Sequence, residues 1–234
     1  MDLDFLPFEI NQIYNVNCMD LLNSLPDNCI PAIITDFPYG IDFQSNQRVK
    51  SEKFKKIAND KKPYIEWIEE AYRVTEEDGG RLICFYRYDV QDVLFDELEL
   101  CGFTIKSQLV WDKKVHGMGD LKGEFSPAHE LMVYATKGRY EFSGEVKRPT
   151  TVYNCQRVDA MKLCHPNEKP VILNQALIRD ITTKNELVLD LFSGSGSLSV
   201  AAKIEGRNWL ACDLDKRYVD IGNQRCSQVE RRVF

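Results

Sequence analysis

Residues 187–215 read LVLDLFSGSGSLSVAAKIEGRNWLACDLD, and this stretch decides the fold of the 234-residue chain. It holds, in order, a short apolar run, a glycine-rich turn, a helical pattern and a second apolar run that ends in an acid. Gly194 and Gly196 lack a Cβ atom, which lets the backbone turn sharply and lets a ligand approach it closely. The order predicts a strand, a helix and a second, parallel strand, which is half of a Rossmann-type nucleotide-binding unit.

The glycines and acids of this unit limit the classes of ligand that it could bind. Asp213 follows Gly194 by 19 residues at the end of the second predicted strand, where a carboxylate can accept hydrogen bonds from ribose hydroxyls. A dinucleotide turn would carry a third glycine where Ser199 stands, and the triphosphate-binding pattern G-x-x-x-x-G-K-S/T is absent from this segment. A nucleoside cofactor without a pyrophosphate remains, and S-adenosylmethionine fits that description. This segment alone leaves an ordinary tight turn open as the alternative.

The rest of the chain alternates short apolar runs with amphipathic helical patterns. Helices are predicted at 64–74 and 89–102, because apolar residues recur there at three- and four-residue spacing, and two more helical patterns lie at 169–182 and 197–207. Seven apolar runs are predicted to be buried strands: 13–18, 30–35, 81–86, 105–111, 131–135, 187–192 and 208–213. This alternation predicts an α/β fold with a mixed, mostly parallel seven-stranded sheet that helices cover on both faces.

Length and composition set the broad class of protein. A chain of 234 residues with 44% apolar and 28% charged residues is typical of one globular domain, spanning 1–234. No apolar run is long enough to cross a bilayer, and the acidic N-terminus does not resemble a secretory signal. We therefore expect a cytoplasmic protein, in a bacterial cell or a phage-infected host, with no membrane partner.

The cysteines and histidines give no sign of a metal site. The eight cysteines are scattered without a C-x-x-C pair, and the three histidines match no zinc signature. We expect reduced, mostly buried thiols and assign no metal.

The net charge of −6 argues against a protein that coats nucleic acid indiscriminately. One segment differs from the rest of the chain: residues 44–62 hold seven Lys or Arg and two acids, a net charge of +5. A charge run of this kind is often only a solvated loop or helix face. Its place directly after a second notable motif favours a functional role.

That second motif is IITDFPYGIDF, residues 33–43, where an acid and two aromatic residues follow a buried strand. In open α/β sheets, ligands bind in the crevice outside the carboxyl ends of the strands. Asp36, Asp190 and Asp213 all lie at or near predicted strand ends, so we expect them to share one crevice.

DFPYG has the residue types that methylation of an exocyclic base amine requires. The lone pair of such an amine is conjugated into the ring, so acceptors for its N–H groups are needed to localise it. Asp36 supplies a carboxylate, and the carbonyl of Phe37 supplies a second acceptor, because Pro38 holds the preceding residue extended. Tyr39 can stack on a base that has been flipped out of the duplex.

Together these motifs resemble those of the DNA amino-methyltransferases, in which D-P-P-Y is the catalytic signature and F-x-G-x-G marks cofactor binding. The order here is DFPYG, then a variable insertion, then HPNEKP, then DLFSGSGS. That circularly permuted order is similar to the β class of N6-adenine and N4-cytosine methyltransferases. The resemblance covers about residues 13–225. It differs from the protein-glutamine methyltransferases, whose glycine motif comes before an N-P-P-Y.

The resemblance implies a Rossmann-like methyltransferase fold, S-adenosylmethionine as cofactor and a set of site residues. The catalytic signature falls on Asp36, Phe37, Pro38 and Tyr39. The positions implied to bind cofactor are Asp20, His165, Lys169, Asp190, Phe192, Gly194, Gly196, Ser197 and Asp213. His165 and Lys169 belong to the H-P-x-x-K-P motif. Two of these residues have an alternative: Asp20 could be the N-cap of a short helix, and Lys169 a surface residue near a helix start.

Two positions depart from the family pattern. Phe37 replaces the first proline of the signature, and Asn167 stands where threonine or serine is common. We expect altered rate or substrate preference, and a degenerate, inactive copy stays open. Adenine is favoured over cytosine, because the N4-cytosine enzymes more often carry serine at the position of Asp36.

The predicted partner is double-stranded DNA with a flipped target base. In the 44–62 loop, five basic side chains are expected to contact phosphates: Arg48, Lys50, Lys53, Lys55 and Lys56. The resemblance implies that residues 137–169 are the target-recognition insertion, which is short here, so a short recognition sequence, a homodimer or a partner subunit could each compensate. Its aromatic residues Tyr140, Phe142 and Tyr153 could contact DNA or pack beneath the loop. Other readings stay open: a noncatalytic DNA-binding subunit, an RNA methyltransferase and, more distantly, a dehydrogenase.

Overall fold

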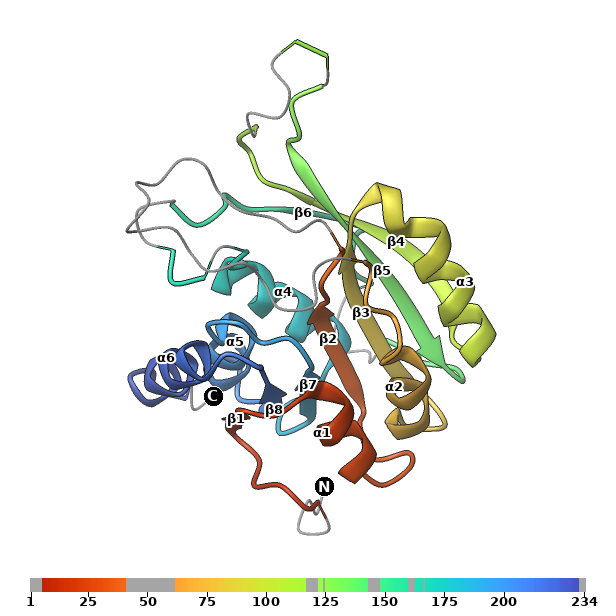
Figure 1. Cartoon of the computed structure of the whole chain (residues 1–234), viewed down its shortest axis with the longest axis vertical. Coiled ribbons are helices and arrows are strands. Elements are labelled where there is room, and N and C mark those ends of the chain that lie inside the picture. The colour runs from red at the N-terminus through yellow and green to blue at the C-terminus, as the bar shows by residue number, and fades with distance from the viewer. Residues whose placement is uncertain are drawn as a thin grey trace.

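The computed structural model describes residues 6–40, 62–116, 122–123, 125–142, 148–159, 163–165 and 167–231. Its strands form one sheet in the order β1-β8-β7-β2-β3-β5-β4-β6 (Figure 1). The strands are β1 (Gln12–Tyr14), β2 (Ala32–Asp36), β3 (Gly80–Tyr86), β4 (Thr104–Asp112), β5 (His129–Lys137), β6 (Val152–Asn154), β7 (Leu187–Asp190) and β8 (Asn208–Cys212). The helices are α1 (Cys18–Ser24), α2 (Ile68–Val74), α3 (Gln91–Cys101), α4 (Val171–Ile181), α5 (Ser197–Ile204) and α6 (Lys216–Ser227), and a 3-10 turn spans Tyr88–Val90.

The direction of the strands places the candidate site. β1, β8, β7, β2 and β3 run parallel, whereas β5 is antiparallel to both β3 and β4. The carboxyl ends of β2, β7 and β8 therefore open on the same edge of the sheet as the end of β4. The mixed, mostly parallel α/β sheet expected from the sequence is confirmed.

The strand count differs from the prediction, because the sheet has eight strands rather than seven. The extra strand is β6, which pairs in parallel with β4 through Val110–Val152 and Trp111–Tyr153. It lies within 137–169, which showed no convincing long element. Three residues with an exposed, half-buried, exposed pattern are too few for a periodic signal.

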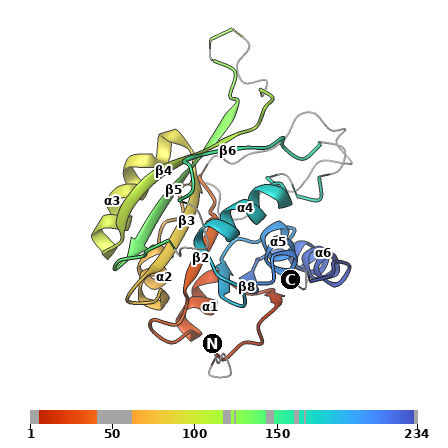
Figure 2. The ribbon, with the colours of Figure 1, turned by 180° about the vertical axis from the view of Figure 1, so that it is seen from behind.

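Helices cover both faces of the sheet, as the alternation predicted (Figures 1 and 2). One core lies against α1, α2 and α3 and includes Leu21, Ile68 and Leu94. The second core lies against α4, α5 and α6 and includes Leu177 and Val200. The two apolar faces explain why the central strands are continuous apolar runs.

The helix ends follow local chemistry. α3 ends at Gly102, whose φ of 109° only glycine adopts readily. Asn17 is the N-cap of α1, because its side chain accepts from the Met19 N–H, and Asp215 caps α6 in the same way. The predicted 64–74 helix begins only at Ile68. Among the described helices, α1 and α6 had not been predicted from the sequence.

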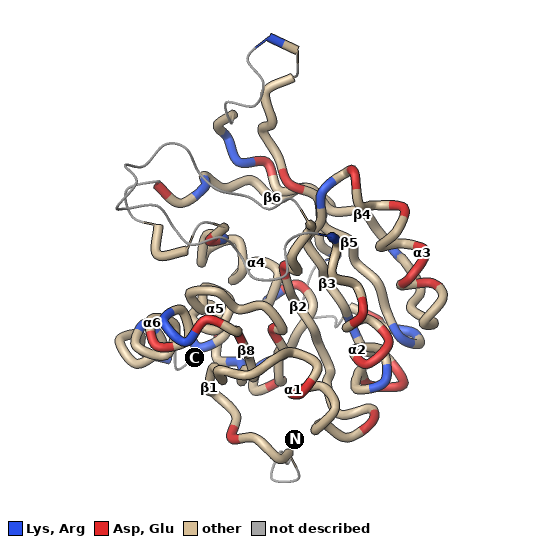
Figure 3. Tube along the Cα trace, viewed as in Figure 1, with Lys and Arg blue, Asp and Glu red and all other residues tan. Residues whose placement is uncertain are grey.

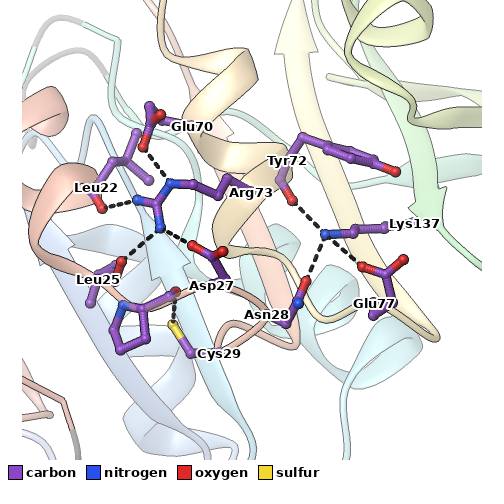
Figure 4. Close-up of polar contacts among 11 residues, drawn as sticks. Leu22, Leu25, Asp27, Asn28, Cys29, Glu70, Tyr72, Arg73, Glu77 and Lys137 are labelled. Atoms are coloured by element: carbon purple, nitrogen blue, oxygen red, sulfur yellow. Dashed lines mark hydrogen bonds and ion pairs between the residues drawn. The ribbon is translucent and has the colours of Figure 1, made fainter.

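Arg73, which is half-buried, and Lys137, which is buried, hold the structure together near the amino end of β2, away from the carboxyl ends of the parallel strands (Figure 4). Arg73 on α2 donates to the carbonyls of Leu22 and Leu25 at 2.8 and 2.9 Å. Lys137 at the end of β5 donates to Asn28 Oδ1 at 2.7 Å and to the Tyr72 carbonyl at 3.0 Å. The loop that enters β2 is thereby tied to α2 and β5, which fixes β2 at its amino end.

Two expectations from composition can be compared with the structure. Five of the eight cysteines are buried, which confirms that the thiols are mostly internal. Within the described residues, we find no helix with the length and apolar character needed to cross a membrane.

Candidate active site

A cavity of about 460 Å³ opens at the carboxyl ends of β2, β7 and β8. It brings together three segments that are far apart in the chain: the DFPYG turn, the glycine turn and residues 165–169. Eleven of the site residues predicted from the sequence line it: Asp36, Phe37, Pro38, Tyr39, His165, Lys169, Asp190, Phe192, Gly194, Ser197 and Asp213. The crevice expected for the three aspartates is therefore present.

The two glycines of the turn play different parts. Both have left-handed backbones, with φ of 49° at Gly194 and 74° at Gly196. A Cβ on Gly196 would lie 2.7 Å from Ile13 Cδ1 and 2.8 Å from Gly222 Cα. Gly196 thus allows close packing beneath the turn and is absent from the cavity lining, whereas Gly194 lies in the lining beside His165.

Asp213 joins the glycine turn to the loop after β8 through hydrogen bonds to its carboxylate. Its Oδ2 accepts from the Gly194 N–H at 2.8 Å, and its Oδ1 accepts from the Asp215 N–H at 2.8 Å. Burial raises the pKa of Asp213, and the two backbone N–H groups lower it in part. Each carboxylate oxygen keeps a further lone pair, so Asp213 can also accept from a ribose hydroxyl.

Asp190 lies beneath the turn rather than at its surface. It is 6% exposed, and its Oδ1 accepts from the Thr35 hydroxyl at 3.0 Å and the Phe192 N–H at 3.2 Å. Burial raises the pKa of Asp190 to about 7. Its visible role is to join the ends of β2 and β7.

The DFPYG turn points its acid into the cavity and its first aromatic ring into the core. Asp36 ends β2, and the Tyr39 hydroxyl donates to Asp36 Oδ1. Phe37 is 2% exposed and packs against Trp67, with ring centroids 6.1 Å apart, and edge-to-face against Tyr39 at 5.2 Å. Phe37, which stands where the D-P-P-Y signature has its first proline, therefore adds an apolar anchor beneath the DFPYG turn.

Lys169 lies at the Asp36 carboxylate rather than on the surface. Its ammonium is 2.7 Å from Asp36 Oδ2 and 2.9 Å from Glu130 Oε2. The residue is buried, so its alternative assignment as a surface residue is wrong. Burial alone would lower the pKa of Lys169, but Asp36 and Glu130 together raise it.

Glu130 is a further residue of the site, and no motif in the sequence indicated it. It lies at the start of β5 and also pairs with Lys113, whose Nζ is 2.7 Å from Glu130 Oε1. Burial raises the pKa of Glu130, but Lys169 and Lys113 outweigh burial and lower it overall. The only sequence signal was an acid directly before the apolar run 131–135.

His165 packs against the glycine turn and α6. Its ring lies edge-to-face with Tyr218 at 4.5 Å, and the Asn167 N–H approaches its Nδ1 at 3.3 Å. Burial and the nearby Lys169 lower the pKa of His165 to about 4, so the ring is neutral near pH 7. Pro166, the next residue of the H-P-x-x-K-P motif, lies outside the described residues.

A second missed pair braces the segment that carries His165. Glu168, whose side chain is 4% exposed, pairs with Arg225 at 2.7 Å. Arg225 also donates to the carbonyl and hydroxyl of Ser195, each at 2.9 Å. These contacts connect residues 165–169 to α6 and the glycine turn.

Asp20 does not join the cluster. It is exposed in the first turn of α1 and does not line the cavity. The cap of that helix is Asn17, so the alternative of Asp20 as N-cap is wrong. Cys18 and Tyr64 line the cavity nearby, and neither had been predicted.

The predicted DNA-contacting loop falls almost wholly outside the described residues. This applies to Arg48, Lys50, Lys53, Lys55 and Lys56. Lys62, the last residue of the 44–62 loop, pairs with Glu66 at 2.9 Å. Figure 3 shows Lys and Arg on described parts of the β4–β5 connection and after β6, whereas acids gather over α2 and α3.

The 137–169 segment contributes aromatic residues to the core. Tyr140, Phe142 and Tyr153 pack against the core beneath α4 and α5, and the Tyr153 hydroxyl donates to Asp180 at 2.7 Å. Packing, which competed with DNA contact as their role, is what the structure shows. Across the described ranges, no cluster of three or more His, Cys, Asp or Glu side chains is arranged to hold a metal ion.

Comparison with known proteins identifies relatives over nearly the whole chain. A sequence model of a DNA methylase family matches residues 30–224. YubD of Escherichia coli (strain K12) is 31% identical over 221 residues, which cover 93% of this chain and 90% of YubD. The type II methyltransferase M1.MboII of Moraxella bovis is 25% identical over 264 residues, which cover 95% of this chain and 98% of M1.MboII.

Solved structures share the fold. The M1.HpyAVI–SAM complex matches with a TM-score of 0.70 and 23% identity, covering 92% of this chain and 98% of that chain. The cytosine-N4-specific PvuII DNA methyltransferase matches with a TM-score of 0.70 and 17% identity, covering 95% of this chain and 87% of that chain.

Proposed function

Because this chain belongs to the DNA methylase family whose sequence model spans residues 30–224, we propose that it methylates the N6 amine of adenine in double-stranded DNA. It is an S-adenosylmethionine-dependent DNA methyltransferase of the N6/N4 family. The observation that carries the proposal is the position of Asp36, which lines the same cavity as the glycine turn and Asp213. On this proposal, the acceptor for the base amine and the site for the nucleoside share one cavity.

The residues of the cavity fit S-adenosylmethionine. Its volume of about 460 Å³ lies within the range of small-molecule sites, about 300–1,000 Å³. Asp213 offers carboxylate oxygens to ribose hydroxyls, and the glycine turn offers backbone at close range. When bound, the cofactor supplies an electrophilic methyl group on a sulfonium.

Asp36 and its neighbours hold the amine that receives the methyl group. The Asp36 carboxylate accepts from an amine N–H and draws its lone pair out of conjugation, and the Phe37 carbonyl is proposed as the second acceptor. The Tyr39 hydroxyl and Lys169 fix the carboxylate from both sides. Stacking on Tyr39 would offset part of the few kcal/mol that flipping a base costs.

DNA would approach the edge where β2, β4 and β6 end. We assign phosphate contacts to the basic 44–62 loop and target recognition to 137–169. Because this target-recognition segment is short, a homodimer would enlarge the surface that contacts DNA. The reaction would take place where the DNA is, in the cytoplasm.

N4-cytosine methylation is the second candidate. The support is that a cytosine-N4-specific enzyme, PvuII DNA methyltransferase, has the same fold with a TM-score of 0.70. Both reactions place an exocyclic amine between a side-chain acceptor at position 36 and the carbonyl of residue 37, so much of the site chemistry is common to them. Aspartate rather than serine at position 36 favours adenine.

The test is expression in a bacterial host that lacks its own DNA methylases, followed by modified-base sequencing of the genome. N6-methyladenine at a defined motif is the expected result. N4-methylcytosine would overturn the adenine assignment while keeping the enzyme class. If the genome is unmodified while the purified protein binds S-adenosylmethionine and DNA, a noncatalytic subunit is favoured; methylation of RNA alone would favour an RNA enzyme.

A further inference from the structure

We propose that Glu130 is a positioning residue for methyl transfer: it shares the Lys169 ammonium with Asp36 and so keeps the Asp36 carboxylate a strong acceptor for the substrate amine. The inference rests on the proposed function and deepens it. Glu130 does not line the cavity and acts through Lys169.

The geometry is a row of alternating charges. Asp36 Oδ2 lies 2.7 Å from Lys169 Nζ, which lies 2.9 Å from Glu130 Oε2. Glu130 Oε1 in turn lies 2.7 Å from Lys113 Nζ. The four residues come from the end of β2, the segment before α4, the start of β5 and the residue after β4. Only the fold brings them together.

These side chains are little exposed to water, so the electrostatic interactions between their charges are strong. Those of Lys169, Asp36 and Glu130 are 10%, 19% and 28% exposed. Water screens such charges weakly, so each one strongly alters the basicity of its neighbour. An unpaired charge here would also be costly, which explains why each charge in the row has an opposite partner.

The role of Glu130 follows from the charge balance around Asp36. Lys169 with Asp36 alone would be a neutral pair, and the carboxylate would be a weak acceptor. Glu130 adds a second negative charge to the same ammonium, whose three N–H groups can serve both partners. The Asp36 oxygens then keep lone pairs and basicity for the substrate N–H groups, although Lys169 and Tyr39 already bind them.

The pKa directions agree with this account. Burial raises the pKa of Asp36, Lys169 lowers it and Glu130 raises it. Among the described residues, the other titratable groups that interact with Asp36 are Tyr39 on its own turn, Cys84 on β3 and Asp190 on β7. Replacing Glu130 by a neutral residue should therefore lower the pKa of Asp36.

The first test is the pH profile of Glu130→Gln. We expect kcat at neutral pH to fall about tenfold, or about 1.4 kcal/mol, with cofactor affinity unchanged within about twofold. The acid limb of the profile should move to lower pH, so the deficit should shrink as the pH falls. Glu130→Asp, which keeps the charge, should recover part of kcat.

A matched control is available at the other edge of the sheet. Glu186 pairs with the buried Arg81 at 2.7 Å. It directly precedes β7, at the opposite end of that strand from Asp190 and the cavity. Glu186→Gln should lower stability without moving the acid limb. If Glu130→Gln behaves like Glu186→Gln, Glu130 is only a structural residue and the inference is overturned.

A second measurement does not depend on turnover. In protein carrying ¹³C-labelled aspartate carboxyls, with Asp36 assigned through Asp36→Asn, NMR titration should give a lower Asp36 pKa in Glu130→Gln than in wild type. An unchanged pKa would refute the inference even if wild type methylates DNA. An inactive wild type would refute the proposed function alone, and the titration would still decide whether Glu130 controls the charge on Asp36.

Discussion

The Thr35 hydroxyl donates to Asp190 Oδ1 over 3.0 Å and so joins the strand that ends in Asp36 to the strand that enters the glycine turn. The same hydroxyl also accepts a hydrogen bond, because the Leu191 N–H donates to Thr35 Oγ1 at 3.3 Å. β2 and β7 are neighbours in the sheet and run parallel. The candidate base site and the candidate cofactor site are therefore held at a fixed separation by buried groups.

Asp190→Asn should stabilise the cofactor-free protein at alkaline pH. Burial raises the pKa of Asp190 from 3.8 to about 7, so the native state binds the proton more tightly than the unfolded state. Its charge costs stability fully above pH 7, and this cost fades as the pH falls from about 7 towards 4. We expect a gain of about 2 kcal/mol at pH 8 that largely disappears near pH 4.

Urea unfolding of Asp190→Asn across this pH range measures the effect. Asn can still accept from Thr35 and Phe192, so little packing is lost. The exposed Asp96→Asn is the matched surface control. A gain that stayed constant with pH would contradict the ionised, buried state of Asp190.

Asp36→Ala should separate catalysis from cofactor binding. We expect methylation to fall by at least about 10³-fold, because the acceptor for the amine is lost. Cofactor affinity, measured by calorimetry, should change little. Retained methylation would remove Asp36 from its proposed catalytic role.

Asp213→Ala should have the opposite signature. Its carboxylate holds the Gly194 and Asp215 N–H groups and is proposed to accept from the ribose. We expect cofactor Kd to rise about 10- to 100-fold, as for a lost hydrogen bond to a charged group. Equal Kd values in Asp213→Ala and wild type would be incompatible with this assignment.

Phe37→Ala should destabilise the whole protein. The ring is 2% exposed and packs against Trp67, so its removal should cost about 3–5 kcal/mol. Phe37→Leu should cost less, and Phe37→Pro, which restores the family signature, should cost stability too. Thermal unfolding of the three variants measures this order. A fully stable Phe37→Ala would show that the ring is not an anchor.

Gly196→Ala should damage the turn by a clash rather than by backbone strain alone. Its Cβ would lie 2.7 Å from Ile13 Cδ1. Gly79 also has a positive φ, but a Cβ there would meet nothing closer than 3.5 Å. We expect Gly79→Ala to cost about 1–2 kcal/mol and Gly196→Ala to cost clearly more. Similar losses of unfolding free energy would argue against close packing at Gly196.

Much of the fold could be predicted because its signals are local. The glycine turn, the apolar runs and the four predicted helices each depend on residues within about a dozen positions of one another. The seven predicted strands are present for this reason. β6 and the short α1 were missed because three to seven residues carry too little periodicity, and α6 because its pattern includes Gly222.

The site residues at strand ends could be predicted, but the ion pairs between segments that are distant in the sequence could not. Asp36, Asp190 and Asp213 could be assigned to one crevice, because parallel strands place their carboxyl ends at one edge. Glu130, Glu168 and Arg225 could not be found, since their partners lie far away in the sequence. Asp20 matched a pattern in sequence and yet lies outside the cavity lining.

The sequence by itself determined the class of fold, the order of the motifs and the kinds of atom offered to a nucleoside and to an amine, because glycine, proline and carboxylate act through their own backbone and charge. Only the tertiary structure decided which charges meet. Lys169 is a partner of Asp36 and Glu130 because β2, β5 and the segment before α4 converge. The strength of such an ion pair depends on distance and burial, and sequence spacing specifies neither.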